Sequence, residues 1–181
     1  MRLLIASDLH GAAEDCARLL AALSRESADR LLLLGDILYH GPRNDLPPSY
    51  APKEVARMLN AEKSRIFCIC GNCDAQVDQM LLEFPIQASY CILSAGNRLI
   101  YATHGHVFTP ASPPPLQPGD ILLTGHTHIP AWECFGQDNL YLNPGSTSIP
   151  KAGSPKGYML LDDTRVCWHT LSGEIYHELT L

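Results

Sequence analysis

The sequence predicts an α/β fold in which two β-sheets pack as a sandwich with helices on the outside. In the first half, short apolar runs alternate with amphipathic segments, as in parallel strands joined by helices. In the second half, short apolar runs are bounded by Gly, Pro, Asn and Asp with little helix between them, which is typical of a mixed or antiparallel sheet. The 181 residues suit one domain with a sizeable core, and neither an internal repeat nor a linker divides them.

The first half reads as three strands, each followed by a helix. An amphipathic helix is expected because Cys16, Leu20 and Leu23 recur at helical spacing. A Pro-rich loop at 40–52 interrupts the alternation, and Pro85 stops the last helix. The expected strands are 2–7, 30–36 and 65–72, and the expected helices are 12–26, 53–61 and 75–84.

The second half contains eight further short strands. A Pro-rich segment, 109–120, cannot lie inside a sheet and must be a loop. The eight runs are "SYCIL", "RLIYATHG", "DILLTG", "AWECF", "LYLNPG", "GYMLLD", "RVCWHTL" and "EIYHELTL".

Composition excludes several classes of function. A net charge of -6 with no basic run argues against a stable nucleic-acid complex. No apolar segment approaches the roughly 20 residues that span a bilayer, and the short apolar run at the N-terminus lacks a signal-peptide pattern, so we expect a cytoplasmic protein. Seven cysteines without framework spacing favour reduced thiols. "CICGNC" has no partner pair for a structural zinc site, and its Cys68 and Cys70 are expected to be small core residues.

Polar side chains follow five of the predicted strands. A single "GD" after a strand is usually a turn, and a single His there is usually a surface residue. Ligand sites in open α/β sheets form beyond the carboxyl ends of strands, so five such ends predict a metal site. In "GHTH", two His at i and i+2 at a strand end should point the same way. The strand ends carry Asp8 and His10, Asp36, Asn72, His104 and His106, and His126 and His128.

The ligand count predicts two ions. Two Asp, one Asn and four of these five His are too many for one ion, but a bridging carboxylate would give each of two ions four ligands. Imidazole mixed with carboxylate and amide oxygen excludes a pure Mg²⁺ or Ca²⁺ cage. We expect Mn²⁺ first, with Zn, Fe, Co or Ni as alternatives.

The ordered motifs resemble the calcineurin-like metallophosphoesterase superfamily, in particular its small bacterial phosphodiesterases. The motifs are "SDLHG", "LGDILYHGPRN", "GNCD", "FPI", "THGH", "GHTH", "NPGS" and "SIPK". The resemblance spans nearly the whole chain. It implies a single domain over 1–181, with a four-layer α/β/β/α sandwich of two mixed sheets flanked by helices. It also implies a metal-dependent phosphoric diester hydrolase that uses a hydroxide bound at a dinuclear metal site.

The resemblance also implies the ligand sets. One ion would be held by Asp8, His10, Asp36 and His128, and the second by Asp36, Asn72, His104 and His126, with Asp36 bridging. His106 matches no ligand position and is expected behind the ligands or near the substrate.

Several further residues are expected around the substrate. Many superfamily members have His where this chain has Cys73, and a thiol is a poorer acid and no cation. This departure predicts weak activity on monoesters; the alternative is that Cys73 only fills space and that His106 or water supplies the proton. Asp74 is expected to orient a His, to cap helix 75–84, or both. Arg43 and Asn44 lie in the loop after the second strand, which could fold over the site, where Arg43 could contact a phosphate or could be a solvated charge. "NPGS" (143–146) is most simply a tight turn.

Other classes of protein stay open. A catalytically weak or inactive scaffold of this fold would bind a protein partner, as one eukaryotic retromer subunit does, but Asp36 and Asn72 keep the catalytic pattern where that subunit departs. A mononuclear amidohydrolase usually needs a Lys at its metal, and Lys53, Lys63, Lys151 and Lys156 are expected away from the ligands. We expect a small-molecule phosphodiester substrate of unspecified identity, no membrane partner, and a possible homo-oligomer, with Trp132 and Trp168 weighed as interface or core.

Overall fold

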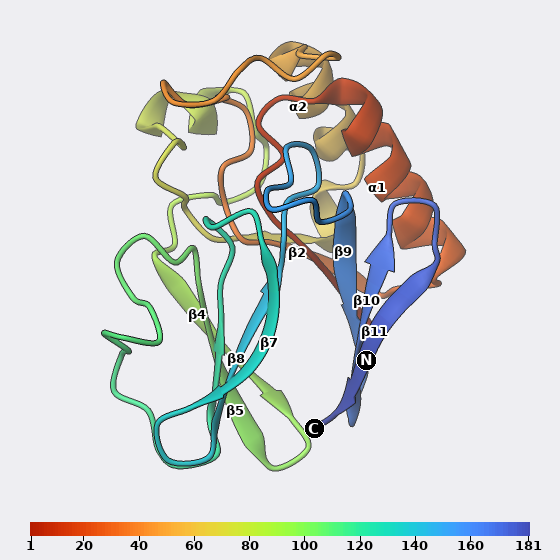
Figure 1. The fold of residues 1–181 in the computed structure, drawn as a ribbon. Coiled ribbons are helices and arrows are strands. Elements are labelled where there is room, and N and C mark those ends of the chain that lie inside the picture. The colour runs from red at the N-terminus through yellow and green to blue at the C-terminus, as the bar shows by residue number, and fades with distance from the viewer.

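The computed structural model describes residues 1–181 as two mixed β-sheets packed face to face (Figure 1). The six-stranded sheet has the order β11-β10-β9-β1-β2-β3, and the five-stranded sheet has the order β4-β5-β6-β8-β7. The first sheet consists of β1 (Leu3–Ala6), β2 (Arg30–Leu33), β3 (Ile66–Cys68), β9 (Gly157–Leu161), β10 (Arg165–Thr170) and β11 (Ile175–Thr180). The second consists of β4 (Tyr90–Ala95), β5 (Arg98–Thr103), β6 (Ile121–Leu123), β7 (Pro130–Phe135) and β8 (Asn139–Pro144).

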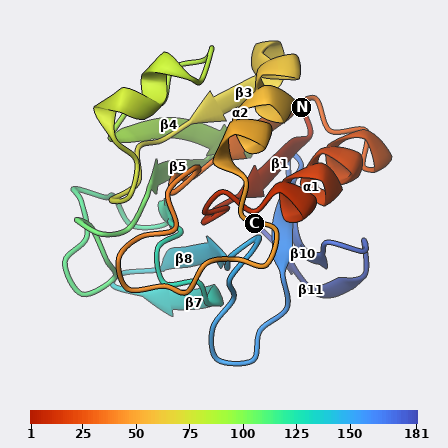
Figure 2. The same cartoon turned by 90° about the horizontal axis from the view of Figure 1, so that it is seen from above.

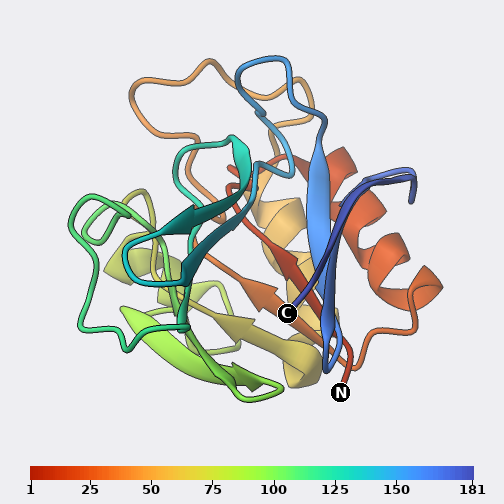
Figure 3. The same ribbon diagram turned by 60° about the horizontal axis from the view of Figure 1, so that its bottom comes forward.

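The six-stranded sheet is apolar on both faces because both faces are covered. In β1, Leu4 points toward the helices, and Leu3 and Ile5 point toward the second sheet. α1 (Ala13–Arg25) and α2 (Pro52–Ala61) cover the outer face (Figure 3). Burial on both faces explains why the strands read as continuous apolar runs rather than as alternating ones.

The predicted fold class is confirmed, and its fourth layer is thin. Both α-helices lie against the six-stranded sheet. On the outer face of the five-stranded sheet, Phe108 from an irregular segment packs edge-on against Tyr101, with ring centroids 5.8 Å apart. No helix is long and apolar enough to cross a membrane.

One predicted helix is wrong. Residues 75–84 form only a short 3-10 helix, η2 (Gln76–Met80), and a second one, η1 (Lys63–Arg65), precedes β3. Val77 and Met80 are 62% and 85% exposed, and the buried apolar residues Leu82 and Phe84 lie beyond η2, so the residues of η2 have no apolar face to bury as an α-helix would. The Gln79 side chain instead takes the backbone groups of Leu82, Phe84 and Ile86.

The cysteines and tryptophans are mostly structural. All seven cysteines are free; Cys68 is buried, and Cys70 is only partly buried, beyond the end of β3. Trp168 is fully buried, and its indole N–H donates to the Asn143 carbonyl oxygen at 2.8 Å. Trp132 is 40% exposed and packs against Trp168.

Candidate metal centre and active site

The carboxyl ends of five strands meet at one end of the sandwich. β1, β2 and β3 run parallel in one sheet, and β5 and β6 run parallel in the other. Seen from above, the loops that contain residues 38–51 and 145–156 lie over this end (Figure 2). The seven predicted ligands all follow these strand ends: Asp8, His10, Asp36, Asn72, His104, His126 and His128.

Most of the predicted ligands stand on strained backbone. Five of the seven have positive φ: Asp8 (56°), His10 (48°), Asp36 (57°), His126 (65°) and His128 (61°). Each such residue costs about 1 kcal/mol or more, and this kind of strain concentrates at functional sites. β6 ends at Leu123, so His126 and His128 lie in a left-handed turn. Both side chains face the same cluster, as expected. The cause is this turn, and the prediction that the two His alternate along a strand is wrong.

Glycines make room for this turn geometry. A Cβ on Gly125 would lie 1.8 Å from Ser7 Oγ and 2.8 Å from Asp8 Oδ2. A Cβ on Gly71 would lie 2.1 Å from Asp36 Oδ1. The glycines of "GHTH" and "GNCD" are therefore needed for backbone to pass directly against the two carboxylates.

Asp8, His10 and His128 form one half of a buried cluster. Asp8 Oδ1 lies 3.3 Å from His128 Nε2 and 3.7 Å from His10 Nε2. The two Nε2 atoms are 3.3 Å apart. All three side chains are less than 5% exposed.

Asp36, Asn72, His104 and His126 form the other half. Asp36 Oδ2 lies 3.5 Å from His104 Nε2 and 3.7 Å from His10 Nε2, so Asp36 stands between the two halves. His104 Nε2 is 3.1 Å from Asn72 Oδ1 and 3.3 Å from His126 Nδ1.

The side-chain atoms of this cluster fit as metal ligands, and without a cation they are poorly satisfied as hydrogen-bonding groups. His10, His104 and His128 each place Nδ1 at 2.6–2.7 Å from a backbone carbonyl oxygen, which can only accept. When these rings are neutral, their Nε2 atoms aim lone pairs at each other and at carboxylate oxygens. Asp8 Oδ1 is buried with no hydrogen-bond partner at all. A buried convergence of acceptors is costly unless a cation occupies it, so these residues fit divalent metal ions.

The titration behaviour has the same cause. Burial opposes the charge of Asp8, but contacts with His10 and His128 outweigh it and lower the Asp8 pKa. Burial likewise opposes protonation of His104, yet contact with Asp36 and the charge of Asp8 raise its pKa to about 9. Protons on the imidazoles thus compete with metal ions for the same carboxylates.

We therefore expect Mn²⁺ affinity to rise as the pH rises toward about 9. Ligation requires neutral His104, so binding at pH 7.5 should release about one proton or more. Calorimetry in two buffers of different ionisation enthalpy measures this release. Because the folded pKa of His104 is raised above 6.5, its stabilisation of the metal-free fold is full below 6.5 and is lost as pH rises through about 9. Binding heats that are the same in both buffers would contradict this expectation.

A layer of hydroxyl and amide groups holds the ligands. The Ser146 and Ser148 hydroxyls both donate to the Asp8 carbonyl oxygen, at 2.8 and 2.9 Å. The Asn143 amide group donates to the Gly125 carbonyl oxygen at 2.7 Å and to the Thr127 hydroxyl at 3.1 Å. "NPGS" is thus more than a tight turn, since it fixes the backbone on both sides of the cluster. Its polar residues were not predicted from the sequence as supports of the site.

Asp74 acts on backbone rather than on a His. Its carboxylate accepts the N–H groups of Asp36, Ile37 and Gly71, each at 2.8 Å. Both expected roles are therefore corrected, because Ala75 stands at the N-cap of η2 and Asp74 contacts no imidazole. Burial raises the pKa of Asp74, and the three N–H groups oppose that rise.

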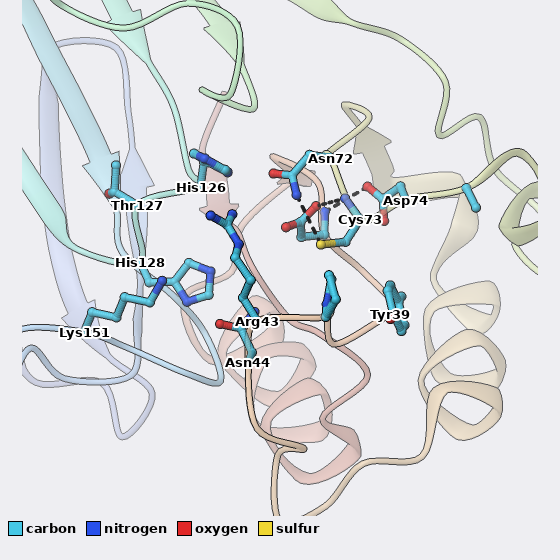
Figure 4. Close-up of a pocket in the computed structure, with 14 residues that line it drawn as sticks. Tyr39, Arg43, Asn44, Asn72, Cys73, Asp74, His126, Thr127, His128 and Lys151 are labelled. Atoms are coloured by element: carbon cyan, nitrogen blue, oxygen red, sulfur yellow. Dashed lines mark hydrogen bonds between the residues drawn. The ribbon is translucent and has the colours of Figure 1, made fainter.

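A cavity of about 790 Å³ opens above the cluster (Figure 4). Cys73 lies in its wall, with Sγ within 4.8 Å of ligand atoms of His10 and Asp36, and its N–H donates to Asp36 Oδ1 at 2.8 Å. Burial, followed by the charge of Asp36, raises the pKa of the Cys73 thiol to about 12. The loop before α2 contributes Tyr39, Gly41, Pro42, Arg43 and Asn44 to the lining.

Lys151 also lines the cavity, from the segment after β8. Its backbone N–H donates to the His128 carbonyl oxygen at 3.0 Å. The expectation that all four lysines lie away from the ligands is therefore wrong for Lys151. The motif "SIPK" contains this lysine. However, the segment after a proline has no helix or strand periodicity from which the direction of the Lys151 side chain could be predicted.

His106 lies outside this cavity. Its ring centroid is 5.4 Å from that of His104, and it lines a smaller neighbouring pocket with Tyr90 and Phe108. Burial and the nearby charge of His104 lower its pKa. The structure thus places His106 next to the cluster but not in the cavity that contains Cys73.

Comparison with known proteins agrees with this fold and site. The model of the calcineurin-like phosphoesterase superfamily domain matches residues 1–165, and the chain belongs to this superfamily. The chain is 45% identical over 163 residues to the phosphodiesterase YfcE of Escherichia coli K12, which covers 90% of this chain and 88% of that protein. The solved structure of YfcE matches with a TM-score of 0.94 and 41% identity over 99% of both chains.

Two more distant proteins also match, one by sequence and one by structure. A probable metallophosphoesterase of Bacillus subtilis, YsnB, is 27% identical over 171 residues, or 89% of this chain and 83% of that protein. Vacuolar protein sorting 29 of Cryptosporidium parvum matches with a TM-score of 0.63 at 21% identity, covering 99% of this chain and 98% of that one. The second likeness shows the fold alone.

Proposed function

We propose that this protein is a metal-dependent phosphodiesterase with weak activity on phosphomonoesters. The observation that supports this most directly is the cluster of two carboxylates, one amide and four imidazoles, buried except for Asn72 and His126, with acceptor atoms facing each other at 3.1–3.7 Å. The likeness to YfcE, a named phosphodiesterase, supports the same activity. We also propose that the whole chain acts as one domain, since β1 near the N-terminus pairs with β9 of the second half.

Two divalent cations, Mn²⁺ by preference, would supply water of lowered pKa and offset charge on the phosphoryl oxygens. Asp8, His10 and His128 would hold one ion, and Asn72, His104 and His126 would hold the other, with Asp36 shared. The protein's own contribution is to hold these donors rigidly. Three backbone carbonyls fix the His tautomers, and the N–H groups of Cys73 and His126 fix Asp36 and Asp8.

Asn72 and Cys73 are placed to act on substrate from one wall of the cavity. We propose that Asn72 also orients a phosphoryl oxygen. A neutral thiol at Cys73 adds no positive charge there. It therefore favours a singly charged diester over a doubly charged monoester.

The activity is tested by removing metal with a chelator and adding back Mn²⁺, Mg²⁺, Zn²⁺ or Co²⁺ singly. We expect Mn²⁺ to restore hydrolysis of bis-p-nitrophenyl phosphate far more than that of p-nitrophenyl phosphate. A protein inactive on both substrates with every metal would rule out the proposal and favour a scaffold that binds a protein partner.

Replacing Cys73 by His tests the basis of the diester preference. We expect Cys73→His to raise turnover of p-nitrophenyl phosphate by roughly tenfold or more, because a positioned imidazole can donate a proton to the leaving oxygen. Cys134→His, at an exposed position in β7, is the matched control and should change nothing. Equal monoesterase rates in wild type and Cys73→His would show that the thiol does not set the preference.

The compartment follows from cysteine chemistry. Seven thiols without one disulfide suit a reducing environment. We propose that the enzyme works in the cytoplasm.

A further inference from the structure

Two cations line the cavity without a partner for their charge. No carboxylate oxygen lies within 4.0 Å of the Arg43 guanidinium or the Lys151 ammonium group, whereas seven other Lys and Arg side chains form ion pairs: Arg25, Arg57, Lys63, Arg65, Arg98, Lys156 and Arg165. Figure 4 shows Arg43 and Lys151 on the side of the cavity where His126 and His128 lie, across from Asn72 and Cys73.

Both cations stand on segments tied to the metal-binding cluster. The Lys151 N–H donates to the His128 carbonyl oxygen, and the Ile149 carbonyl oxygen faces His128 Nδ1 at 2.7 Å. On the other segment, the Tyr39 carbonyl oxygen faces His10 Nδ1 at 2.7 Å. Two residues later, Gly41 adopts φ 82° so close to Cys73 that a Cβ would lie 2.9 Å from its Sγ. The backbone segments that carry the two cations are thus tied to the reaction centre, and their side chains are exposed.

The cavity offers these cations no internal counter-charge. Asp36 and Asp74 are the only carboxylates in its lining. Asp74 is occupied by three backbone N–H groups, and Asp36 lies at the base among imidazoles. A simple phosphodiester carries one negative charge, at the phosphorus over the cluster. Arg43 and Lys151 therefore remain available for a second anionic group on the same ligand.

We propose that Arg43 and Lys151 form a second anion-binding subsite, so that the preferred substrates are phosphodiesters with another phosphate or carboxylate on one ester group. This inference rests on the proposed phosphodiesterase activity and narrows its substrate class. The phosphate and the carboxylate have in common a group of anionic oxygen atoms, several bonds away from the scissile phosphorus.

The test compares two synthetic diesters that differ in one charge. These are 4-carboxyphenyl 4-nitrophenyl phosphate and 4-carbamoylphenyl 4-nitrophenyl phosphate, in which an uncharged amide replaces the carboxylate. Both release p-nitrophenolate. We expect kcat/KM for the carboxylate to be about tenfold higher, mainly through KM, because one favourable charged contact contributes about this factor. The preference should shrink to within about twofold in the double variant Arg43→Gln with Lys151→Met.

Matched controls separate this effect from net charge. Arg18 and Lys53 are exposed cations without ion pairs on the helices α1 and α2. The double variant Arg18→Gln with Lys53→Met removes the same total charge and should keep the tenfold preference. A second anion of phosphate type, tested as the 4-phosphonophenyl ester, distinguishes a phosphate site from a carboxylate site.

Binding provides a readout that does not need turnover. Calorimetry of the Mn²⁺-loaded protein with the monomethyl esters of 4-carboxybenzylphosphonate and 4-carbamoylbenzylphosphonate, which carry one charge at phosphorus as a diester does and cannot be hydrolysed at the C–P bond, should give the same tenfold ratio in Kd. Hydrolysis of bis-p-nitrophenyl phosphate with no carboxylate preference would overturn the subsite and leave the phosphodiesterase proposal standing. No hydrolysis of any diester would overturn the phosphodiesterase, and equal Kd values would then overturn the subsite as well.

Discussion

Asp36→Asn should lower kcat/KM for bis-p-nitrophenyl phosphate by at least about a thousandfold, equivalent to about 4 kcal/mol of transition-state stabilisation. Asp36 is the one carboxylate that approaches imidazoles of both halves of the cluster, at 3.7 Å from His10 and 3.5 Å from His104. Asparagine has the same shape but loses the charge that two cations would share. Its N–H₂ group would also point into the space between the acceptor atoms, where a cation would bind, and an N–H₂ group cannot serve as a metal ligand.

The measurement is steady-state kinetics with Mn²⁺ in excess, together with the metal content of the purified variant. Asp138→Asn is the matched control, because Asp138 is 85% exposed and its φ of 65° is one that Asn tolerates well. It should retain wild-type activity. An Asp36→Asn protein with more than a tenth of wild-type activity would show that Asp36 is not shared between ions.

Asp74→Ala should destabilise the metal-free protein by about 3 kcal/mol or more. The substitution leaves three backbone N–H groups, those of Asp36, Ile37 and Gly71, without their acceptor. Each unsatisfied buried donor costs roughly 1–3 kcal/mol, and water that enters the site recovers part of this. Asp74→Asn keeps one carbonyl oxygen as acceptor and should fall between wild type and Asp74→Ala.

Urea unfolding of the metal-free proteins measures the difference in the free energy of unfolding. Asp78→Ala is the control, because the Asp78 carboxylate accepts only the exposed N–H of Ala75, at 2.9 Å. We expect it to cost about 1 kcal/mol, because the Asp78 carboxylate at the third position of η2 accepts the N–H of the N-cap residue Ala75. If Asp74→Ala and Asp78→Ala were equally stable, the three hydrogen bonds that Asp74 accepts would not be what stabilises the backbone at 36–37 and at Gly71.

The sheets and the ligand set were predictable because both depend on local pattern. Apolar runs such as 30–36 form strands that are buried on both faces of the sheet. The polar residues directly after such a run therefore lie at the end of the strand. Parallel strands bring their carboxyl ends to the same edge, so five strand ends in the sequence become one cluster in space.

Other features depend on contacts between distant segments, which no local pattern encodes. Ser146 and Ser148 reach Asp8 across about 140 positions of sequence, as the separations of 138 and 140 show. Lys151 is placed by one backbone hydrogen bond to His128. The segment 75–84 is a different case: its composition suits a helix, but Val77 and Met80 stay exposed, and the nearby Gln79 side chain bonds to the backbone of Leu82, Phe84 and Ile86.

We propose that this cluster of seven side chains binds two metal ions that share Asp36. The most direct test of this proposal is a titration of chelator-treated protein with Mn²⁺, followed by measurement of the bound metal per chain after removal of free ions. We expect two ions per wild-type chain and one or fewer in Asp36→Asn. A wild-type chain that saturates at a single ion, or binds none, would contradict the dinuclear site and the phosphodiesterase proposal built on it.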